Sequence, residues 1–296
     1  MEVVILGMGA GGLAALKSLR TTEKELGVEP ANVTVVAPEE GLPYSLCALP
    51  FSMCGELDEC YLDRCDPDYL LMNDAKKVSA KVKSVDPKGG LVHLDNGGTL
   101  PYDRLLVSTG SLPFVPPVPG LDIEGVHFLA SLLDSHGIRE WVETGHTRCV
   151  VIGAGFVGIE AAVALAKLGC QVTVVEMLTW VLPRVFDEDV AAIAQKHLEA
   201  GGIDFRLGAQ VTEVVPCEEG AVEAVMLGEE RIECDTVVVG IGVRPNIGFL
   251  EGTGVETHHG ILVKDDMQTS VPGIYAAGDV VEVRSRHTGS PTLGAI

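Results

Sequence analysis

The sequence predicts an α/β fold built from two parallel-sheet lobes of common plan. Three observations support this prediction. An apolar run leads into a glycine-rich turn at residues 3–19 and again at 149–169, an Ala/Leu-rich helix pattern follows each turn, and each lobe closes with another apolar strand that reaches a glycine. A repeat of this kind indicates two copies of one structural unit. A chain of 296 residues is long enough for about two domains with full hydrophobic cores.

Composition and charge exclude several classes of protein. Hydrophobic residues make up 47% of the chain and the mean hydropathy is +0.29, which excludes a disordered chain. The formal net charge of −21 would repel polyanions, so neither nucleic acid nor an anionic membrane is an expected partner. Glycines interrupt the apolar N-terminal stretch, which is too short to span a bilayer. The eight cysteines lack the spacing of a disulfide scaffold, so we expect reduced thiols and a cytoplasmic protein.

Both glycine-rich turns carry the pattern G-x-G-x-x-G between a strand and a helix. Such a turn lets the backbone approach a pyrophosphate, while the helix N-terminus presents the positive end of its dipole to the phosphates. A turn without a ligand is the alternative for one isolated motif, but two motifs in matching context favour two dinucleotide sites. The candidate residues are Gly7, Gly9, Gly11 and Gly12 in the first lobe and Gly153, Gly155, Phe156, Val157 and Gly158 in the second.

Each lobe also contains a predicted β-meander. Strand patterns broken by glycine-rich turns occupy residues 82–100 and 211–232, and a closing strand follows each of them. A further segment, residues 269–283, adds an apolar strand that ends at Gly278 and Asp279 and has no counterpart in the second lobe. We therefore expect two Rossmann-like dinucleotide-binding lobes, each with a β-meander.

Four motifs in this order resemble those of the pyridine nucleotide–disulfide oxidoreductases, which are flavoproteins with two dinucleotide folds. The resemblance implies that the first glycine turn binds the FAD pyrophosphate, that Ser108, Thr109 and Gly110 lie by the FAD, and that Gly278 and Asp279 contact its ribityl chain. The second glycine turn, together with the segment that begins at Gly242, is implied to bind NAD(P)H. The NAD lobe is then inserted in the FAD domain, with expected boundaries of 1–115 and 246–296 for FAD and 116–245 for NAD.

The choice of nicotinamide nucleotide depends on Glu176. This residue ends the predicted strand 171–176, about 20 residues after the glycines, where an acid binds the ribose hydroxyls and repels a 2′-phosphate. No Arg or Lys follows before Arg184, so NADH is favoured over NADPH. The alternative is a solvated glutamate at a strand end. Glu160 is either a partner of the helix dipole or, by resemblance, a neighbour of the nicotinamide.

The first lobe departs from the family pattern. Relatives usually end its second strand with an acid where this chain has Ala37. Glu39 is then the candidate that reaches the FAD ribose from a displaced loop.

Cys47 is the candidate redox residue. Its segment, residues 37–55, resembles the one that carries a single redox cysteine in coenzyme A-disulfide reductases and NADH oxidases. At a helix N-terminus this thiol would have a lowered pKa and could attack a disulfide, reduce a peroxide or contact the flavin. The alternative is a small buried residue that lines the flavin pocket. The segment also resembles flavoprotein subunits of multi-subunit 2-oxoacid and aldehyde oxidoreductases, which need no thiol.

The spacing of the cysteines does not predict a metal site. Cys47, Cys54, Cys60 and Cys65 lie close together in sequence, but they lack the tight C-x-x-C pairs typical of zinc and iron–sulfur ligands. We therefore expect no metal. The other four cysteines flank predicted strands and are interpreted as core residues: Cys149, Cys170, Cys217 and Cys234.

The expected function is hydride exchange between NADH and flavin, with electrons passed to or from an iron–sulfur or other redox subunit. One alternative is a stand-alone NADH oxidase or disulfide or peroxide reductase that uses Cys47. A second is a non-catalytic scaffold that has kept the fold. By resemblance, relatives continue beyond the GD segment into a C-terminal dimerisation domain, whereas this sequence ends at Ile296. Either the sequence is truncated or another subunit supplies the missing part, and an oligomer of this chain would lack the usual dimer surface.

Overall fold

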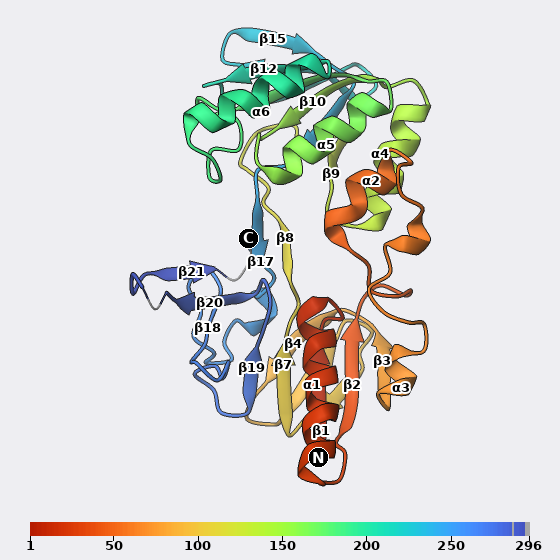
Figure 1. Ribbon diagram of the computed structural model, residues 1–296, viewed down its shortest axis with the longest axis vertical. Coiled ribbons are helices and arrows are strands. Elements are labelled where there is room, and N and C mark those ends of the chain that lie inside the picture. The colour runs from red at the N-terminus through yellow and green to blue at the C-terminus, as the bar shows by residue number, and fades with distance from the viewer. Residues whose placement is uncertain (286, 294–296) are drawn as a thin grey trace. The chain divides into compact units, whose positions relative to one another are not determined.

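The computed structural model describes residues 1–285 and 287–293, which divide into two compact units. The first unit comprises Met1–Tyr44, Asp63–Leu112 and the chain from Arg244 onward, and the second comprises Ser45–Leu62 and Pro113–Val243. Both units contain a parallel sheet with helices against it, as the sequence predicts (Figure 1). The α/β prediction is therefore confirmed.

The sheet of the first unit has five parallel strands in the order β19-β7-β1-β2-β3. Its central strand β1 is an almost continuous apolar run, as expected for a strand that is covered on both faces. The strands are β1 (Glu2–Leu6), β2 (Asn32–Ala37), β3 (Ala75–Ser79), β7 (Arg104–Val107) and β19 (Ile274–Ala276).

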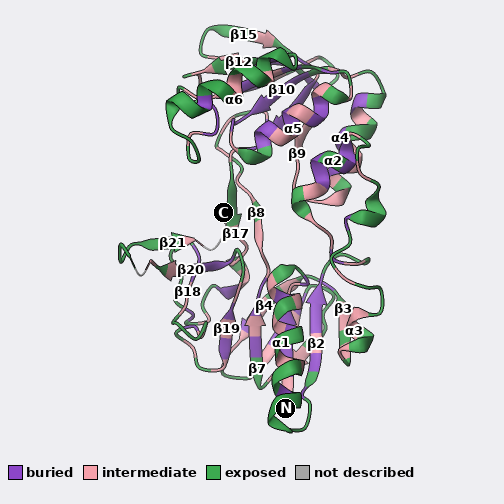
Figure 2. Ribbon diagram, viewed as in Figure 1, coloured by how far each residue is buried: buried purple, intermediate pink, exposed green. Residues whose placement is uncertain are grey.

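Helix α1 (Ala10–Leu26) follows the first glycine turn. It begins after Gly9 and ends at Gly27, whose φ of 63° lets its backbone N–H bond back to the last turn. Leu16 is fully buried in an apolar cluster with the sheet residues Ile5 and Val35, so this face of the helix packs on the sheet (Figure 2). Burying one such side chain stabilises the fold by about 1.5–3 kcal/mol.

The rest of the first unit consists of short elements. The predicted meander is present as the antiparallel sheet β4-β5-β6, and a second three-stranded sheet has the order β18-β20-β21. The bounds are α3 (Tyr69–Met72), β4 (Val82–Asp86), β5 (Leu91–Leu94), β6 (Thr99–Pro101), η3 (Gly248–Leu250), β18 (Ile261–Leu262), β20 (Val281–Arg284) and β21 (Pro291–Leu293).

The sheet of the second unit repeats the plan in the order β12-β11-β10-β16-β9. All its strand pairs are parallel, and helix α5 supplies a large share of the apolar cluster on one face. The bounds are β9 (Val126–Phe128), α4 (Leu132–Glu143), β10 (Arg148–Ile152), α5 (Phe156–Lys167), β11 (Gln171–Glu176), α6 (Glu188–Ala200), β12 (Ile203–Leu207) and β16 (Thr236–Val239).

The predicted second meander is present as β13 (Glu213–Pro216), β14 (Val222–Leu227) and β15 (Glu230–Glu233). The second unit also includes three short helices, η1 (Leu46–Ala48), α2 (Leu49–Met53) and η2 (Glu59–Tyr61), and α2 contacts α4 and α5. The expected boundaries assign residues 45–62 to the FAD domain, whereas the compact units group them with the second sheet. Strands β8 (Ser111–Pro113) and β17 (Val243–Pro245) form a separate two-stranded sheet.

Three of the four cysteines interpreted as core residues are buried: Cys149, Cys170 and Cys234. Cys217 is only half-buried, so the prediction is wrong for this residue. It lies in the turn between β13 and β14, where its backbone N–H donates to the Ala221 carbonyl, and it does not belong to the apolar clusters of the described residues. Among the described residues, no helix combines the length and the apolar character needed to cross a membrane.

Candidate functional site

The first glycine turn needs glycine because three backbone segments meet there. Gly7 has a φ of +103°, and a Cβ on it would lie 2.1 Å from the carbonyl oxygen of Ser108. A Cβ on Gly12 would lie 2.2 Å from the carbonyl oxygen of Gly7. These two glycines therefore let β1, β7 and α1 approach one another closely.

Gly9 has a different role in the same turn. It is the N-cap of α1, it makes no side-chain cap hydrogen bond, and a Cβ on it would meet no atom within 4 Å. The backbone N–H groups in the first turn of a helix lack partners within the helix, so an open N-terminus suits a phosphate. The residues present therefore fit the pyrophosphate of a dinucleotide.

The other predicted flavin contacts of the first unit lie at the same edge of its sheet. Ser108 follows β7, and its hydroxyl donates to the Leu6 carbonyl at 2.9 Å, which ties the end of β7 to the end of β1. The Ala277 N–H donates to Val107 at 3.0 Å, which brings the segment of Gly278 beside β7. A Cβ on Gly11 would lie 3.5 Å from the Gly278 nitrogen. The carboxyl ends of β1, β7 and β19 thus gather these residues, as expected for a site in an open α/β sheet.

Two further predicted residues are held by side-chain contacts. The Thr109 hydroxyl donates to the Asn246 carbonyl at 2.8 Å, and the Ser111 hydroxyl donates to Oδ2 of Asp279 at 3.4 Å. Ser111 was not singled out from the sequence, and only its nearness to the STG segment could have indicated it. Gly110 has a φ of +65° and a Cβ there would meet no atom within 4 Å.

The loop after β2 contains the departure from the family pattern. Ala37 ends β2 and is buried, so it presents no polar group at this position. Glu39 lies beyond it and is exposed. Lys77 on β3 fixes the loop, because its Nζ donates to the carbonyls of Glu40 at 2.9 Å and Gly41 at 2.8 Å. Partial burial lowers the pKa of Lys77.

The second glycine turn repeats the geometry of the first. Gly153 has a φ of +102°, and a Cβ on Gly158 would lie 1.9 Å from its carbonyl oxygen. Gly155 is the N-cap of α5, without a side-chain cap, and a Cβ on it would meet no atom within 4 Å. Gly240, at the end of β16, was missed by the sequence analysis. A Cβ on Gly240 would lie 2.9 Å from the Cα of Gly158, so this position also needs glycine.

Glu176 at the end of β11 contacts the second glycine turn directly. Its Oε2 accepts the backbone N–H of Ala154 at 2.7 Å, and its Oε1 accepts that of Leu178 at 2.8 Å. The Leu182 N–H donates to the Ala154 carbonyl at 2.8 Å, and Leu182 has a φ of 51°. Both polar atoms of the Ala154 backbone are therefore engaged, and the loop after β11 is tied to the second glycine turn. Nothing in the sequence indicated the contact made by Leu182.

The remaining predicted nicotinamide contacts also belong to the second unit. Phe156 and Val157 form the first turn of α5 and are 50% and 38% exposed, so both present apolar surface beside the turn. Gly242 follows β16 with a φ of +110°, and its carbonyl accepts the N–H of Phe114 at 2.9 Å.

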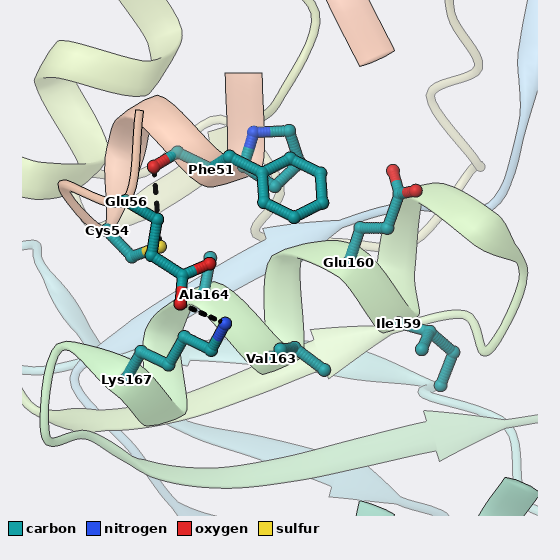
Figure 3. Close-up of a pocket in the computed structure, with 9 residues that line it drawn as sticks. Phe51, Cys54, Glu56, Ile159, Glu160, Val163, Ala164 and Lys167 are labelled. Carbon is teal, nitrogen blue, oxygen red and sulfur yellow. Dashed lines mark hydrogen bonds and ion pairs between the residues drawn. The ribbon is translucent and has the colours of Figure 1, made fainter. Parts of the chain in front are cut away.

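Glu160 lies at a pocket between α2 and α5 (Figure 3). The pocket has a volume of about 100 Å³ and is lined largely by apolar atoms, with Phe51, Cys54 and Val163 among its residues. Lys167 forms an ion pair with Glu56, whereas the Glu160 carboxyl points away from that pair in Figure 3. Burial raises the pKa of Glu160, which favours its uncharged form.

Cys47 is exposed and lies in the middle of the short helix η1, within the second unit. The helix that follows, α2, has only five residues, so Cys47 does not stand at the N-terminus of a long helix as the sequence analysis expected. Cys54 is half-buried, and its thiol donates to the Phe51 carbonyl at 3.5 Å. Across residues 1–285 and 287–293 there is no group of three or more His, Cys, Asp or Glu side chains that could hold a metal ion.

Residues 1–293 match one protein family, described as pyridine nucleotide-disulphide oxidoreductase. The chain belongs to this family. Its members are oxidoreductases that use FAD, and relatives of known structure bind NADH. The two glycine turns described above fit these two cofactors.

Two relatives illustrate the similarity. An NADH oxidase from Methanocaldococcus jannaschii is 35% identical over 308 residues, which covers 99% of this chain and 66% of the relative. The epsilon subunit of an NADH-dependent phenylglyoxylate dehydrogenase from Aromatoleum evansii is 32% identical over 296 residues, which covers 100% of this chain and 68% of the subunit. The chain thus spans about two thirds of the length of these relatives.

Solved structures show the same similarity. A water-forming NADH oxidase from Lactobacillus brevis bound to NADH matches with a TM-score of 0.88 and 26% identity over 99% of this chain and 65% of that one. A covalent complex of putidaredoxin reductase with putidaredoxin matches with a TM-score of 0.90 and 29% identity, over 99% and 70% of the two chains.

Proposed function

We propose that the chain is an NADH-linked flavoprotein that exchanges electrons with a separate redox protein or subunit. The single observation that carries this proposal is the presence of two open glycine turns, one in each unit, each at the head of a long helix without a side-chain cap. Bound FAD and NADH would supply the hydride transfer. The residues of the chain bind and orient the two nucleotides.

In this proposal the first unit binds FAD. Gly9 leaves room for the pyrophosphate, Ser108 and Thr109 hold the end of β7, and Asp279 follows β19 at the same sheet edge. Glu39 is the candidate for the ribose, on a loop that Lys77 fixes. The second unit binds the nicotinamide nucleotide, and we keep the proposed inserted domain at 116–245.

Glu176 supports NADH as the nucleotide. Each of its carboxylate oxygens accepts one backbone N–H and keeps further lone pairs for ribose hydroxyls. A 2′-phosphate at the same place would bring two anionic groups together, and Arg184 is the first basic residue after the strand. The carboxylate therefore selects NADH over NADPH.

Glu160 is proposed to lie beside the nicotinamide. Its raised pKa allows it to be uncharged in a largely apolar surrounding, where a charged carboxylate would be costly. In its uncharged form the carboxyl can donate a hydrogen bond to the carboxamide of the nucleotide and accept one from it.

A separate redox partner is supported by the similarity to a subunit of a multi-subunit dehydrogenase and to a reductase solved with its redox protein. The second candidate function is a stand-alone NADH oxidase or a disulfide or peroxide reductase that uses Cys47. It is favoured by the exposure of this thiol and by the similarity to NADH oxidases.

The Cys47→Ser variant separates the two functions. We expect it to keep both the NADH-dependent reduction of bound FAD and the reduction of an added iron–sulfur protein or rubredoxin. The control is Cys60→Ser, which changes another exposed thiol within residues 45–62. Two results together would favour the second function instead. The unaltered chain would transfer no electrons to a redox protein, and Cys47→Ser, but not Cys60→Ser, would lose turnover with oxygen, peroxide or a disulfide.

A further inference from the structure

A pair of thiols lies in the second unit, apart from the residues proposed to bind nucleotides. Cys149 is the second residue of β10, and Cys170 directly precedes β11. The two strands are parallel neighbours, with Cys149 opposite Val172 in the register. Both cysteines belong to the apolar cluster on one face of the sheet, both line the same cavity, and the interaction between their thiols shifts the pKa of each. The structure therefore brings together two thiols that are 21 positions apart in sequence.

The pair borders a cavity large enough to hold a small polar molecule. Cys149 and Cys170 line a cavity of about 290 Å³ whose polar residues include Arg148, Asp204 and Glu233. One water occupies about 30 Å³ in the liquid, so this volume admits several molecules of that size. The cavity lies at the amino ends of β10 and β11, whereas the glycine turn follows the carboxyl end of β10. It is therefore distinct from the proposed nucleotide site.

The two thiols differ in acidity. Hydrogen bonding with the Cys149 thiol lowers the pKa of Cys170, although burial and the nearby Asp235 oppose this shift. The same interaction, together with burial, raises the pKa of Cys149. Cys170 is also the more accessible of the two, at 8% exposed against 2% for Cys149, so we assign it as the nucleophile of the pair. Cys234 differs from this pair in two ways. It belongs to the apolar cluster on the other face of the sheet, and burial raises its pKa to about 12.

We propose that Cys149 and Cys170 form a redox-active dithiol that a peroxide converts reversibly to a disulfide. The Cys170 thiolate attacks one oxygen of hydrogen peroxide, the O–O bond breaks, and the released hydroxide takes a proton and leaves as water. The Cys149 sulfur then attacks the resulting Cys170 sulfenic acid. The S–S bond forms, the S–O bond breaks, and the hydroxyl group leaves as a second water with the Cys149 proton. The dithiol loses two electrons, and the peroxide gains them.

This disulfide would close a loop around the nucleotide-binding part of the second unit. The segment between the two cysteines contains β10, the second glycine turn and α5. Closing such a loop restricts the unfolded chain and stabilises the folded one. The oxidised unit is therefore expected to unfold at a higher temperature than the reduced unit, whether or not the proposed electron-transfer function is correct.

Peptide mapping of the full chain tests the proposal directly. The reduced protein is treated with hydrogen peroxide, its remaining thiols are alkylated in denaturant, and it is digested with trypsin without reduction. Cleavage after Arg148, Lys167 and Arg184 separates the two cysteines into the peptides 149–167 and 168–184. We expect these two peptides to be joined, with the loss of one hydrogen from each, and to separate again after treatment with dithiothreitol.

The peptide that contains Cys234 is the internal control, because this thiol is buried on the other face of the same sheet. It should be recovered alkylated. The proposal is overturned if peptides 149–167 and 168–184 are both recovered alkylated and unjoined while exposed thiols such as Cys47 and Cys60 are oxidised.

Thermal unfolding provides a second readout. Peroxide should raise the midpoint temperature of the unaltered protein and of Cys234→Ser, but not that of Cys170→Ser. An equal rise in Cys170→Ser would contradict the proposal. If Cys170→Ser does not fold, the peptide map of the unaltered chain remains decisive.

Discussion

The backbone N–H of Ala154 donates a hydrogen bond of 2.7 Å to Oε2 of Glu176. This contact joins the turn at the end of β10 to the acid at the end of β11, so the proposed pyrophosphate and ribose contacts are held in a fixed relation. The loop after β11 adds the bond from the Leu182 N–H to the Ala154 carbonyl. The three segments form one preorganised surface in the second unit.

Replacing Glu176 by Gln should weaken NADH binding and reduce discrimination against NADPH. The amide removes the charge that repels a 2′-phosphate and weakens the bonds to ribose, and a loss of about 1.4 kcal/mol corresponds to a tenfold rise in the dissociation constant. Titration with NADH and NADPH measures both effects. Glu218→Gln, at an exposed turn of the same unit, is the control. Unchanged affinities in Glu176→Gln would remove this residue from the site.

Two glycines of the first turn should respond differently to Ala. At Gly9 the added methyl meets no protein atom within 4 Å, so Gly9→Ala should fold normally but lose FAD, because the methyl occupies space that the pyrophosphate needs. At Gly12 the methyl would lie 2.2 Å from the Gly7 carbonyl oxygen, so Gly12→Ala should be destabilised by about 1–3 kcal/mol. Thermal unfolding and the flavin absorbance after desalting measure the two outcomes. Full flavin retention in Gly9→Ala would refute the proposed role of this turn.

Lys77→Met should lower the affinity for FAD without unfolding the first unit. The methionine keeps most of the apolar stem but cannot donate to the carbonyls of Glu40 and Gly41, which releases the loop that carries Glu39. The loss of two such bonds predicts a rise of roughly tenfold in the FAD dissociation constant. A flavin titration measures it, with Lys83→Met as a control in the same unit. Equal affinities in the two variants would exclude the loop as a flavin contact.

Glu282 should make the stability of the first unit dependent on acid pH. Burial of this carboxyl would raise its pKa, but hydrogen bonds from the Gly260 N–H, the His258 ring and the His259 N–H outweigh burial and lower the pKa below its usual 4.5. A lowered folded-state pKa gives a stabilisation that is present above about pH 4.5 and is lost as the pH falls through the folded-state value.

Urea unfolding at neutral pH and at successively lower pH measures the stabilisation by Glu282 as a function of pH. Glu282→Gln should be less stable than the unaltered chain at neutral pH by about 1–3 kcal/mol, and the difference should shrink as the pH falls below about 4.5. The exposed Glu229→Gln should show neither effect. A difference that is constant with pH would mean that the Glu282 charge does not contribute.

The sequence predicted the parts of the fold that depend on local patterns. The glycine turns, the apolar parallel strands and both meanders are each encoded within a short segment, so spacing and composition were enough to place them. The end of β2 at Ala37 came from the resemblance to relatives that have an acid at this position.

Contacts that depend on tertiary structure were not predictable in this way. Lys77 holds a loop 36 residues away, and Leu182 adopts a positive φ that no local preference of leucine favours. Residues 45–62 form helices too short to show a periodicity, so their grouping with the second sheet could not be anticipated. Cys149 and Cys170 were each expected in the core, but their contact depends on the pairing of β10 with β11.

The most direct test of the account is the visible spectrum of the purified chain after addition of FAD and desalting, followed by NADH in the absence of oxygen. We predict a retained flavin absorbance that NADH bleaches, and a much weaker response to NADPH at the same concentration. Failure to retain FAD, or a bound flavin that NADH leaves oxidised, would contradict the proposal that this chain couples the two nucleotides.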